Sequence, residues 1–112
     1  MQLTKYFFAL SAVLGMVNAF RGDATFFAPG LGACGQHNND NDLIVALSAP
    51  KYGNGSNCGK RIKVNYKGKS VTVKVVDKCP GCASNDIDLS PAAFSRLANQ
   101  DLGRIKVDWN FV

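Results

Sequence analysis

The chain has 112 residues, of which 46% are hydrophobic and 19% are charged, and its formal net charge is +5. Such a length supports one small domain with a modest core. The basic excess favours anionic partners without identifying one, and no helix-turn-helix, zinc-finger or RNA-binding signature accompanies it, so we expect no nucleic-acid partner.

The N-terminus predicts a secretory signal peptide at residues 1–19. Lys5 precedes an apolar run at residues 6–17, and Val17-Asn18-Ala19 supplies small residues for cleavage. An uncleaved membrane anchor is the alternative, but the run is shorter than the about 20 residues that a bilayer span needs. We therefore expect a secreted protein without membrane association, whose single domain occupies residues 20–112.

From Gly22 onward, short β-like runs alternate with turns rich in Gly and Asn, which predicts a mainly β domain. Strict alternation at residues 61–66 places Ile62, Val64 and Tyr66 inward, and Lys67-Gly68-Lys69 turns the chain into the next strand. The strands are expected at residues 24–27, 43–47, 61–66, 70–76 and 105–112.

The stretch from Val71 to Phe94 carries the candidate site. Its β run delivers Asp77 to a strand end, and Ser90-Pro91 opens a helix at residues 91–99 directly after Asp88, with Ser as N-cap and Pro at the first helical position. Two carboxylates are thereby held by rigid elements at the ends of a short loop. This suits acid chemistry or polar ligand contacts, which need carboxylates in fixed geometry.

Four cysteines in an exported chain imply two disulfides, with three possible pairings. We favour Cys34 with Cys58, which closes a long loop and stabilises the fold by roughly 3 kcal/mol, and Cys79 with Cys82, which fixes local geometry. The single CxxC makes a zinc site or a thioredoxin-like redox pair the weaker alternatives.

Seven segments in order resemble the expansin and barwin superfamily, and most closely the loosenins, small fungal expansin-like proteins. The segments are GDATFF, ACG, DLIVALS, NCGK, VVDKCPGC, DIDLSPAAF and VDWNFV. The resemblance covers about residues 22–112. It implies a single six-stranded double-psi β-barrel with one short helix.

The resemblance also implies site residues. Asp88 corresponds to the general acid of related family 45 glycoside hydrolases, while Thr25 and Asp77 match polar residues that line the groove of bacterial expansins. Inverting hydrolysis needs a second carboxylate as base, and Ala28-Pro29 stand where the hydrolases supply it.

Two further residues complete the candidate substrate-binding set. Phe26 and Phe27 are adjacent on one strand, so one ring faces the core and the other a groove or solvent, where it could stack on sugar. We take Phe27 as the candidate. Asp86 is the second candidate for substrate binding, and its alternative role is to support the turn through its side chain.

No cofactor or metal is expected. His37, Asp40 and Asp42 lie in a polar run, but Ile44 occupies a position that an EF-hand needs for a ligand. The basic residues of the hairpin form a face that is either simply solvated or contacts acidic polysaccharide; they are Arg61, Lys63, Lys67, Lys69 and Lys74.

Three functions follow as hypotheses. The leading one is a secreted, monomeric protein that binds cell-wall polysaccharide (cellulose, chitin or a related β-glucan) and loosens it without hydrolysis. The second is an enzyme of the lytic transglycosylase type, for which one acid, Asp88, suffices. The third is a cysteine-protease inhibitor or a defence-type binding protein, since related secreted proteins share the fold.

Overall fold

The computed structural model describes residues 19–112, so the leader expected at residues 1–19 lies outside the described part except for its last residue. Among the described residues, no helix combines the length and the apolar character that crossing a membrane requires. The elements are β1 (Phe20–Phe26), β2 (Ile44–Ser48), α2 (Ala49–Tyr52), β3 (Arg61–Tyr66), β4 (Lys69–Cys79), β5 (Ile87–Leu89), α3 (Pro91–Leu97), a 3-10 turn (Gln100–Leu102) and β6 (Ile105–Phe111).

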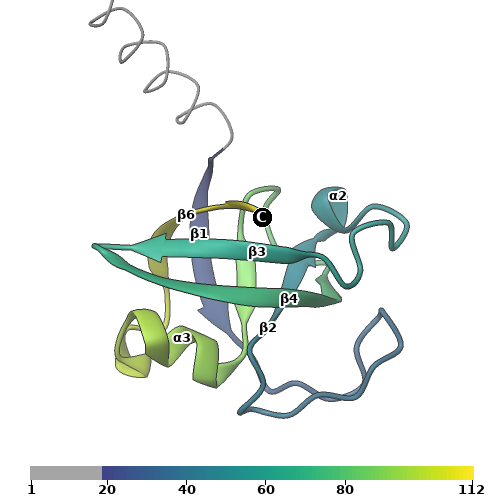
Figure 1. Ribbon diagram of the computed structural model, residues 1–112, viewed down its shortest axis with the longest axis horizontal. Helices are drawn as coiled ribbons and strands as arrows, with labels where there is room; N and C mark the ends of the chain where they lie inside the picture. The colour runs from purple at the N-terminus through teal and green to yellow at the C-terminus, as the bar shows by residue number, and fades with distance from the viewer. Residues whose placement is uncertain (1–18) are drawn as a thin grey trace, which may run out of the picture.

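The six strands close into a barrel in the order β1-β5-β2-β4-β3-β6 (Figure 1). The β1–β5 and β2–β4 pairs are parallel, and the remaining pairs are antiparallel. Because the sheet closes on itself, none of these six strands presents an unpaired edge along the barrel wall. The expected mainly β, six-stranded barrel is confirmed.

Alternation along the strands fills the barrel. Ile62 and Val64 of β3 are fully buried, whereas Tyr66, also expected inward, is partly buried at the strand end. All five residues of β2 are buried, as the apolar run Ile44–Leu47 predicts for a strand covered on both faces, and the fifth is the polar Ser48. Trp109 of β6 is the largest fully buried side chain.

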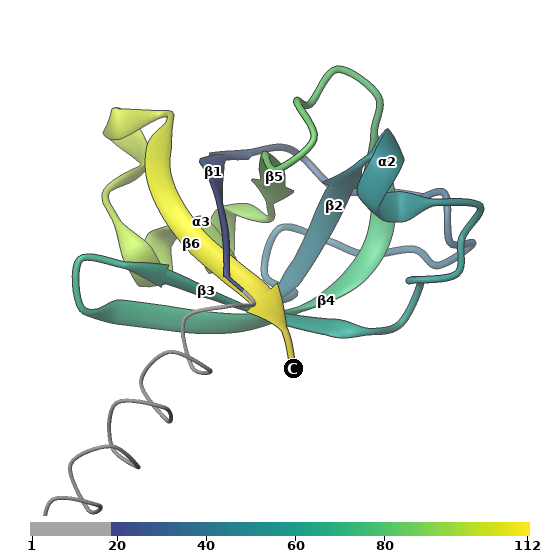
Figure 2. The same ribbon diagram turned by 90° about the horizontal axis from the view of Figure 1, so that it is seen from above.

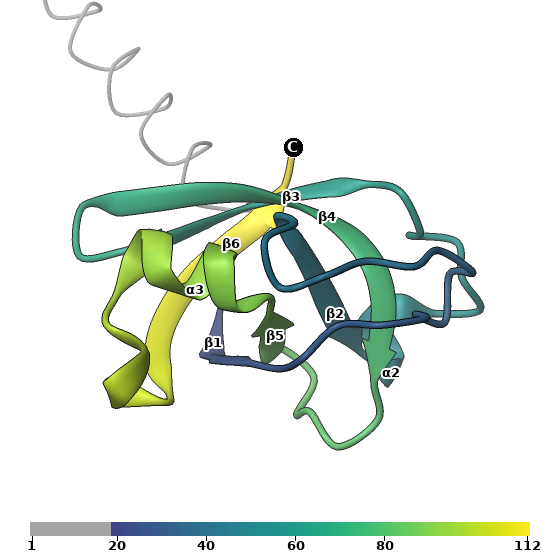
Figure 3. The same cartoon turned by 90° about the horizontal axis from the view of Figure 1, so that it is seen from below.

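Helix α3 covers one end of the barrel (Figure 3). The Ser90 hydroxyl accepts a hydrogen bond from the Ala93 N–H and Pro91 stands in the first turn, as the sequence predicts. Phe94 is fully buried against Phe26, with ring centroids 4.8 Å apart. The helix ends at Leu97, two residues before the predicted end, because Ala98 is already extended.

Two elements are additional to those placed from the residue pattern. Strand β5 has only three residues, Ile-Asp-Leu, and α2 is a single turn begun by Ser48 and Pro50. Neither is long enough to establish a period of its own. The existence of a sixth strand followed only from the family resemblance, and β5 is the strand that carries Asp88.

Both favoured disulfides are confirmed. Cys34 is bonded to Cys58, with Cα atoms 5.8 Å apart, and Cys79 to Cys82, with Cα atoms 5.4 Å apart. The first ties the segment between β1 and β2 to the segment that follows α2. The second closes a ring at the end of β4, directly after Asp77.

Candidate functional site

Four neighbouring strands place one residue each in a row across the barrel wall. Asp88 of β5 pairs with Thr25 of β1 on one side and with Ala46 of β2 on the other, and Ala46 pairs in turn with Asp77 of β4. We call these four residues the aspartate row. Paired residues of adjacent strands point to the same side of a sheet. Since two strand spacings separate the two aspartates, their Cα atoms lie about 10 Å apart.

The aspartate row faces outward. The neighbours of its members along the strands belong to the core: Ala24, Val45, Leu47, Ile87 and Leu89 are all fully buried. Alternation of side chains therefore directs Thr25 and Asp88 to the outer surface.

A β-bulge brings Asp77 into the row. Val45 pairs with Val75, but the next residue of β2, Ala46, pairs with Asp77, so Val76 is the extra residue of β4. Without this insertion Asp77 would lie opposite Leu47, and its side chain would be directed to the other side of the sheet. The bulge thus determines that both carboxylates share one surface.

Asp88 is partly buried and directly bonded within the row. The Thr25 hydroxyl donates a hydrogen bond to Asp88 Oδ1 at 2.9 Å. Burial raises the pKa of the Asp88 carboxyl above its ordinary value, against the opposing effects of the Thr25 hydrogen bond and the positive charge of Arg104. Asp88 therefore keeps its proton to a higher pH than an exposed aspartate, as an acid catalyst or a hydrogen-bond donor to sugar oxygens would need.

Asp77 is fixed by backbone groups. Its Oδ1 accepts hydrogen bonds from the N–H groups of Ala33 and Lys78, each at 2.8 Å. The first of these joins β4 to the long segment between β1 and β2, which crosses β2 and β4 when viewed from below (Figure 3). Asp77 thus contributes to the architecture as well as to the row.

Asp86 lies in a charged cluster beside the row. Its Oδ1 accepts a hydrogen bond from the Asp23 N–H at 2.8 Å. Arg104 lies 3.2 Å from Asp23 and 3.8 Å from Asp86, and Lys106 lies 3.3 Å from Asp23. Hydrogen bonds from Lys106 and Arg104 lower the pKa of Asp23. These side-chain contacts join the β4–β5 loop to β1 and to Arg104, and the role of Asp86 in ligand binding stays a prediction.

Arg104 was not among the residues singled out from the sequence. It lies just before β6, and its guanidinium favours the ionised form of Asp88. No local pattern marks it, because only the pairing of β6 with β1 brings it near the aspartates. Its position is a product of the barrel closure.

The two adjacent phenylalanines have different surroundings. Phe26 packs on Phe94, whereas Phe27 lies just beyond β1, where its N–H donates to the Leu89 carbonyl at 3.0 Å. Phe26 is therefore the ring that joins the core. Phe27, which is partly buried, remains the candidate for contact with a ligand.

The loop between β4 and β5, residues 80–86, is anchored from three directions and lies beside α2 (Figure 2). Ser48 Oγ donates to the Ser84 carbonyl at 2.7 Å, and Lys51 Nζ donates to Ser84 Oγ at 3.2 Å and to Asn85 Oδ1 at 3.1 Å. Trp109 Nε1 donates to the Asn85 carbonyl at 2.8 Å. This loop joins Asp77 to Asp88, so its anchoring fixes their relative positions.

We expect Gly22→Ala to lower the free energy of unfolding by about 1–3 kcal/mol, as overpacking typically does. A Cβ at Gly22 would lie 2.2 Å from the Asn85 carbonyl oxygen, so β1 and the β4–β5 loop would have to separate. Gly30→Ala is the matched control, because a Cβ there meets nothing within 4 Å. Urea denaturation of both variants measures the difference, and equal stability of the two would contradict this close packing.

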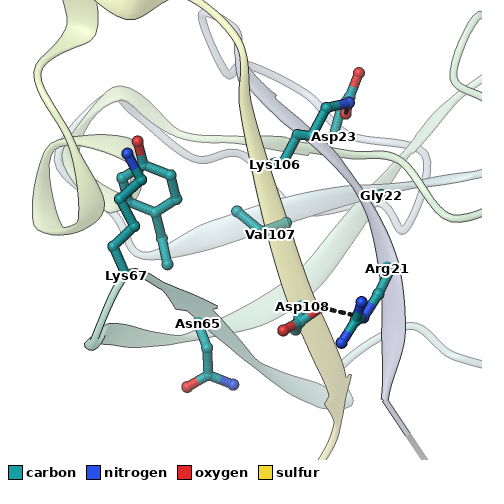
Figure 4. A pocket seen from close by; sticks show the side chains of 9 residues that line it. Arg21, Gly22, Asp23, Asn65, Lys67, Lys106, Val107 and Asp108 are labelled. Atoms are coloured by element: carbon teal, nitrogen blue, oxygen red, sulfur yellow. Dashed lines mark hydrogen bonds and ion pairs between the residues drawn. The ribbon is translucent and has the colours of Figure 1, made fainter.

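The described residues contain no group of three or more His, Cys, Asp or Glu side chains that could hold a metal ion. A hollow does exist elsewhere, over β1, β3 and β6 (Figure 4). Arg21 and Asp108, which form an ion pair of 3.2 Å between β1 and β6, line it together with Asp23 and Lys106. The aspartate row instead spans β1, β5, β2 and β4, so the two surfaces share only β1.

Residues 19–109 match the family model described as lytic transglycolase. An EG45-like domain containing protein of Citrus jambhiri is 36% identical, covering 91% of this chain and 88% of its own. The papain inhibitor of Streptomyces mobaraensis is also 36% identical, with 91% and 78% covered. The Allergen Asp f 7 homolog of Arthroderma benhamiae is 38% identical over 81% of this chain, which spans only 38% of that protein's length.

Two solved structures are similar over most of the chain. The Streptomyces papain inhibitor superposes with a TM-score of 0.78 at 33% identity, covering 86% of this chain and 96% of its own. A Clavibacter michiganensis expansin variant in complex with cellohexaose also has a TM-score of 0.78, at 29% identity. The match covers 84% of this chain and 50% of the expansin chain.

Proposed function

The chain belongs to the lytic transglycolase family of double-psi β-barrel proteins, and we propose that it is a secreted protein that binds cell-wall polysaccharide at the aspartate row and loosens it without hydrolysis. Cellulose, chitin or a related β-glucan is the proposed ligand, and a monomer the proposed form. Thr25, Asp77, Asp86 and Phe27 would contact the glycan around Asp88. The similarity to an expansin solved with cellohexaose supports a β-linked glucan.

The observation that carries the proposal is the state of Asp88. Its carboxyl is partly buried, hydrogen-bonded to Thr25, and directed away from the barrel core. Burial raises the pKa of this carboxyl, so it is protonated more readily than an exposed aspartate, and it can exchange hydrogen bonds with sugar hydroxyls.

Loosening requires no bond cleavage. A site that binds separated or strained chains more tightly than packed ones shifts their equilibrium by the difference in affinity. Inverting hydrolysis would need a second, base-like carboxylate about 6.5–9.5 Å from the acid. Ala28-Pro29 occupy the expected place of that base, and Asp77 Oδ1 already accepts two backbone hydrogen bonds.

We expect Asp88→Asn to abolish dispersal of cellulose or chitin fibres, with no reducing ends released by either protein. Asn keeps the size of Asp and the acceptor for Thr25, so the fold should be retained, but it can supply neither a carboxyl proton nor a carboxylate to the glycan. Asp40→Asn, at an exposed loop position, is the matched control and should disperse fibres normally. Fibre binding, dispersal and both soluble and insoluble reducing ends are measured in the same tubes.

Lytic transglycosylation is the second candidate, and the raised pKa of Asp88 favours it, because one protonated acid suffices when a hydroxyl of the sugar is the nucleophile. Peptidoglycan is therefore included among the substrates. Product release by the parent protein that disappears in Asp88→Asn would overturn the loosening proposal.

Inhibition of a cysteine protease is the third candidate, favoured by the nearly complete superposition on the Streptomyces papain inhibitor. An exposed loop offers a contact for it: Leu31 is 71% exposed and bridges to His37. Inhibition of papain that is lost in Leu31→Ser but retained in Asp88→Asn would favour this function over polysaccharide binding.

A further inference from the structure

The positive charge of the chain is concentrated on one hairpin. Residues 60–79, which include β3 and β4, hold seven of the 13 basic residues and a single aspartate. In Figure 1 these two strands form a long ribbon across the front of the barrel. The charge is therefore a property of one surface rather than of the whole molecule.

The outward side chains of the hairpin bring like charges together. Arg61 of β3 pairs directly with Lys74 of β4, and Lys63 with Thr72, one row further along. Like charges directly opposite each other in a sheet are destabilising. All four ion pairs within residues 19–112 use Arg21, Arg104 or Lys106, so neither Arg61 nor Lys74 makes an ion pair there.

A hollow lies beside this pair of like charges. It has a volume of about 440 Å³ and is lined by the Arg61–Lys74 pair, Thr72 and, from the segment before β2, Asn38 and Asp42. This volume lies within the range of about 300–1,000 Å³ that is typical of sites for small ligands. The Asp42 carboxylate is held within its own loop, since Oδ2 accepts from Asn38 Nδ2 at 3.1 Å and from the Asn39 N–H at 3.0 Å.

The other groups on this surface indicate the kind of anion. The outward positions of β3 and β4 alternate cations with hydroxyl and amide groups, from Asn65, Ser70 and Thr72, and none of these outward side chains is aromatic. Single-stranded nucleic acid is held largely by stacking on aromatic rings, and a membrane surface needs an apolar face to insert. A ligand rich in hydroxyls that carries regular negative charges fits these groups instead.

We propose that the hollow between β3, β4 and the segment before β2 binds a carboxylate-bearing polysaccharide, with Arg61 and Lys74 holding one uronate carboxylate and Lys63 the next. Bidentate geometry suits the Arg61 guanidinium to this anion. The site is separate from the aspartate row and does not depend on its function. It would hold the protein on an acidic wall matrix while the row engages a neutral glycan.

The test is retention by de-esterified polygalacturonate in affinity electrophoresis at low salt. Arg61→Gln/Lys74→Gln should weaken binding about tenfold or more, as expected from the loss of two charge-assisted contacts. Arg21→Gln/Arg96→Gln removes the same net charge from other exposed positions and should change binding less than about threefold. Since the first variant relieves a like-charge pair, its unfolding midpoint should not fall, which excludes misfolding as the cause.

Two further controls test whether the retention depends on the carboxylates of the polymer. Fully methyl-esterified polygalacturonate has the same backbone without the charge and should not be retained, and Asp88→Asn should bind polygalacturonate like the parent. Equal loss in both double variants, retention by the esterified polymer, or tighter binding of a short DNA duplex would each overturn the proposal. Failure of Asp88→Asn to disperse fibres would bear only on the aspartate row.

Discussion

Replacing Trp109 with alanine is expected to lower the free energy of unfolding by about 3–5 kcal/mol, the usual cost of truncating a buried tryptophan. Trp109 is fully buried, and its ring centroid lies 4.7 Å from that of Phe20 and 5.6 Å from that of Phe111. A small domain has only about 5–15 kcal/mol of stability in total. The variant should therefore be partly unfolded at moderate temperature.

Trp109 also connects the core to the candidate site. Its Nε1 donates to the Asn85 carbonyl, in the loop that joins Asp77 to Asp88. Trp109→Phe is the control, because it keeps an aromatic ring and removes this donor; we expect a loss of about 1–3 kcal/mol from the unsatisfied carbonyl and reduced packing. Circular dichroism must follow the denaturation, since this is the only tryptophan of the chain. A loss below about 1 kcal/mol in Trp109→Ala would contradict its central place in the core.

The sequence predicted the strands that follow a clear period. Strict alternation at Arg61–Tyr66 located β3 to the residue, and Ser90-Pro91 located the start of α3, because both signals are local. The favoured disulfide pairing is confirmed, although the cysteine spacing alone left three pairings open. What local signals could not establish was which residues become neighbours across the closed barrel.

The aspartate row shows this limit at particular positions. Its spacing depends on the bulge at Val76 and on the placement of β5 between β1 and β2. The sequence does carry a signal of the bulge. Val75 and Val76 are consecutive apolar residues, both of them buried, and this breaks the alternation of β4. Nothing comparable marks β5, whose three residues pair with strands distant in sequence.

The two disulfides are expected to contribute differently. Cys34→Ser/Cys58→Ser should lower the free energy of unfolding by about 3 kcal/mol. The lost crosslink joins two residues 24 positions apart and restrains the unfolded chain between them. Cys79→Ser/Cys82→Ser removes a ring with a separation of only three residues, so its global cost should be clearly smaller. Urea denaturation of the two double variants gives both values under the same conditions.

The smaller ring is expected to matter more for the site than for the fold. It closes directly after Asp77, at the point where the β4–β5 loop begins, so its loss frees that end of the loop while Ser48, Lys51 and Trp109 still hold the other. Fibre dispersal should then fall more in Cys79→Ser/Cys82→Ser than its stability predicts, whereas in Cys34→Ser/Cys58→Ser it should follow the folded fraction. Unchanged dispersal in the first variant would mean that the three contacts to Ser84 and Asn85 are sufficient to place Asp77 and Asp88.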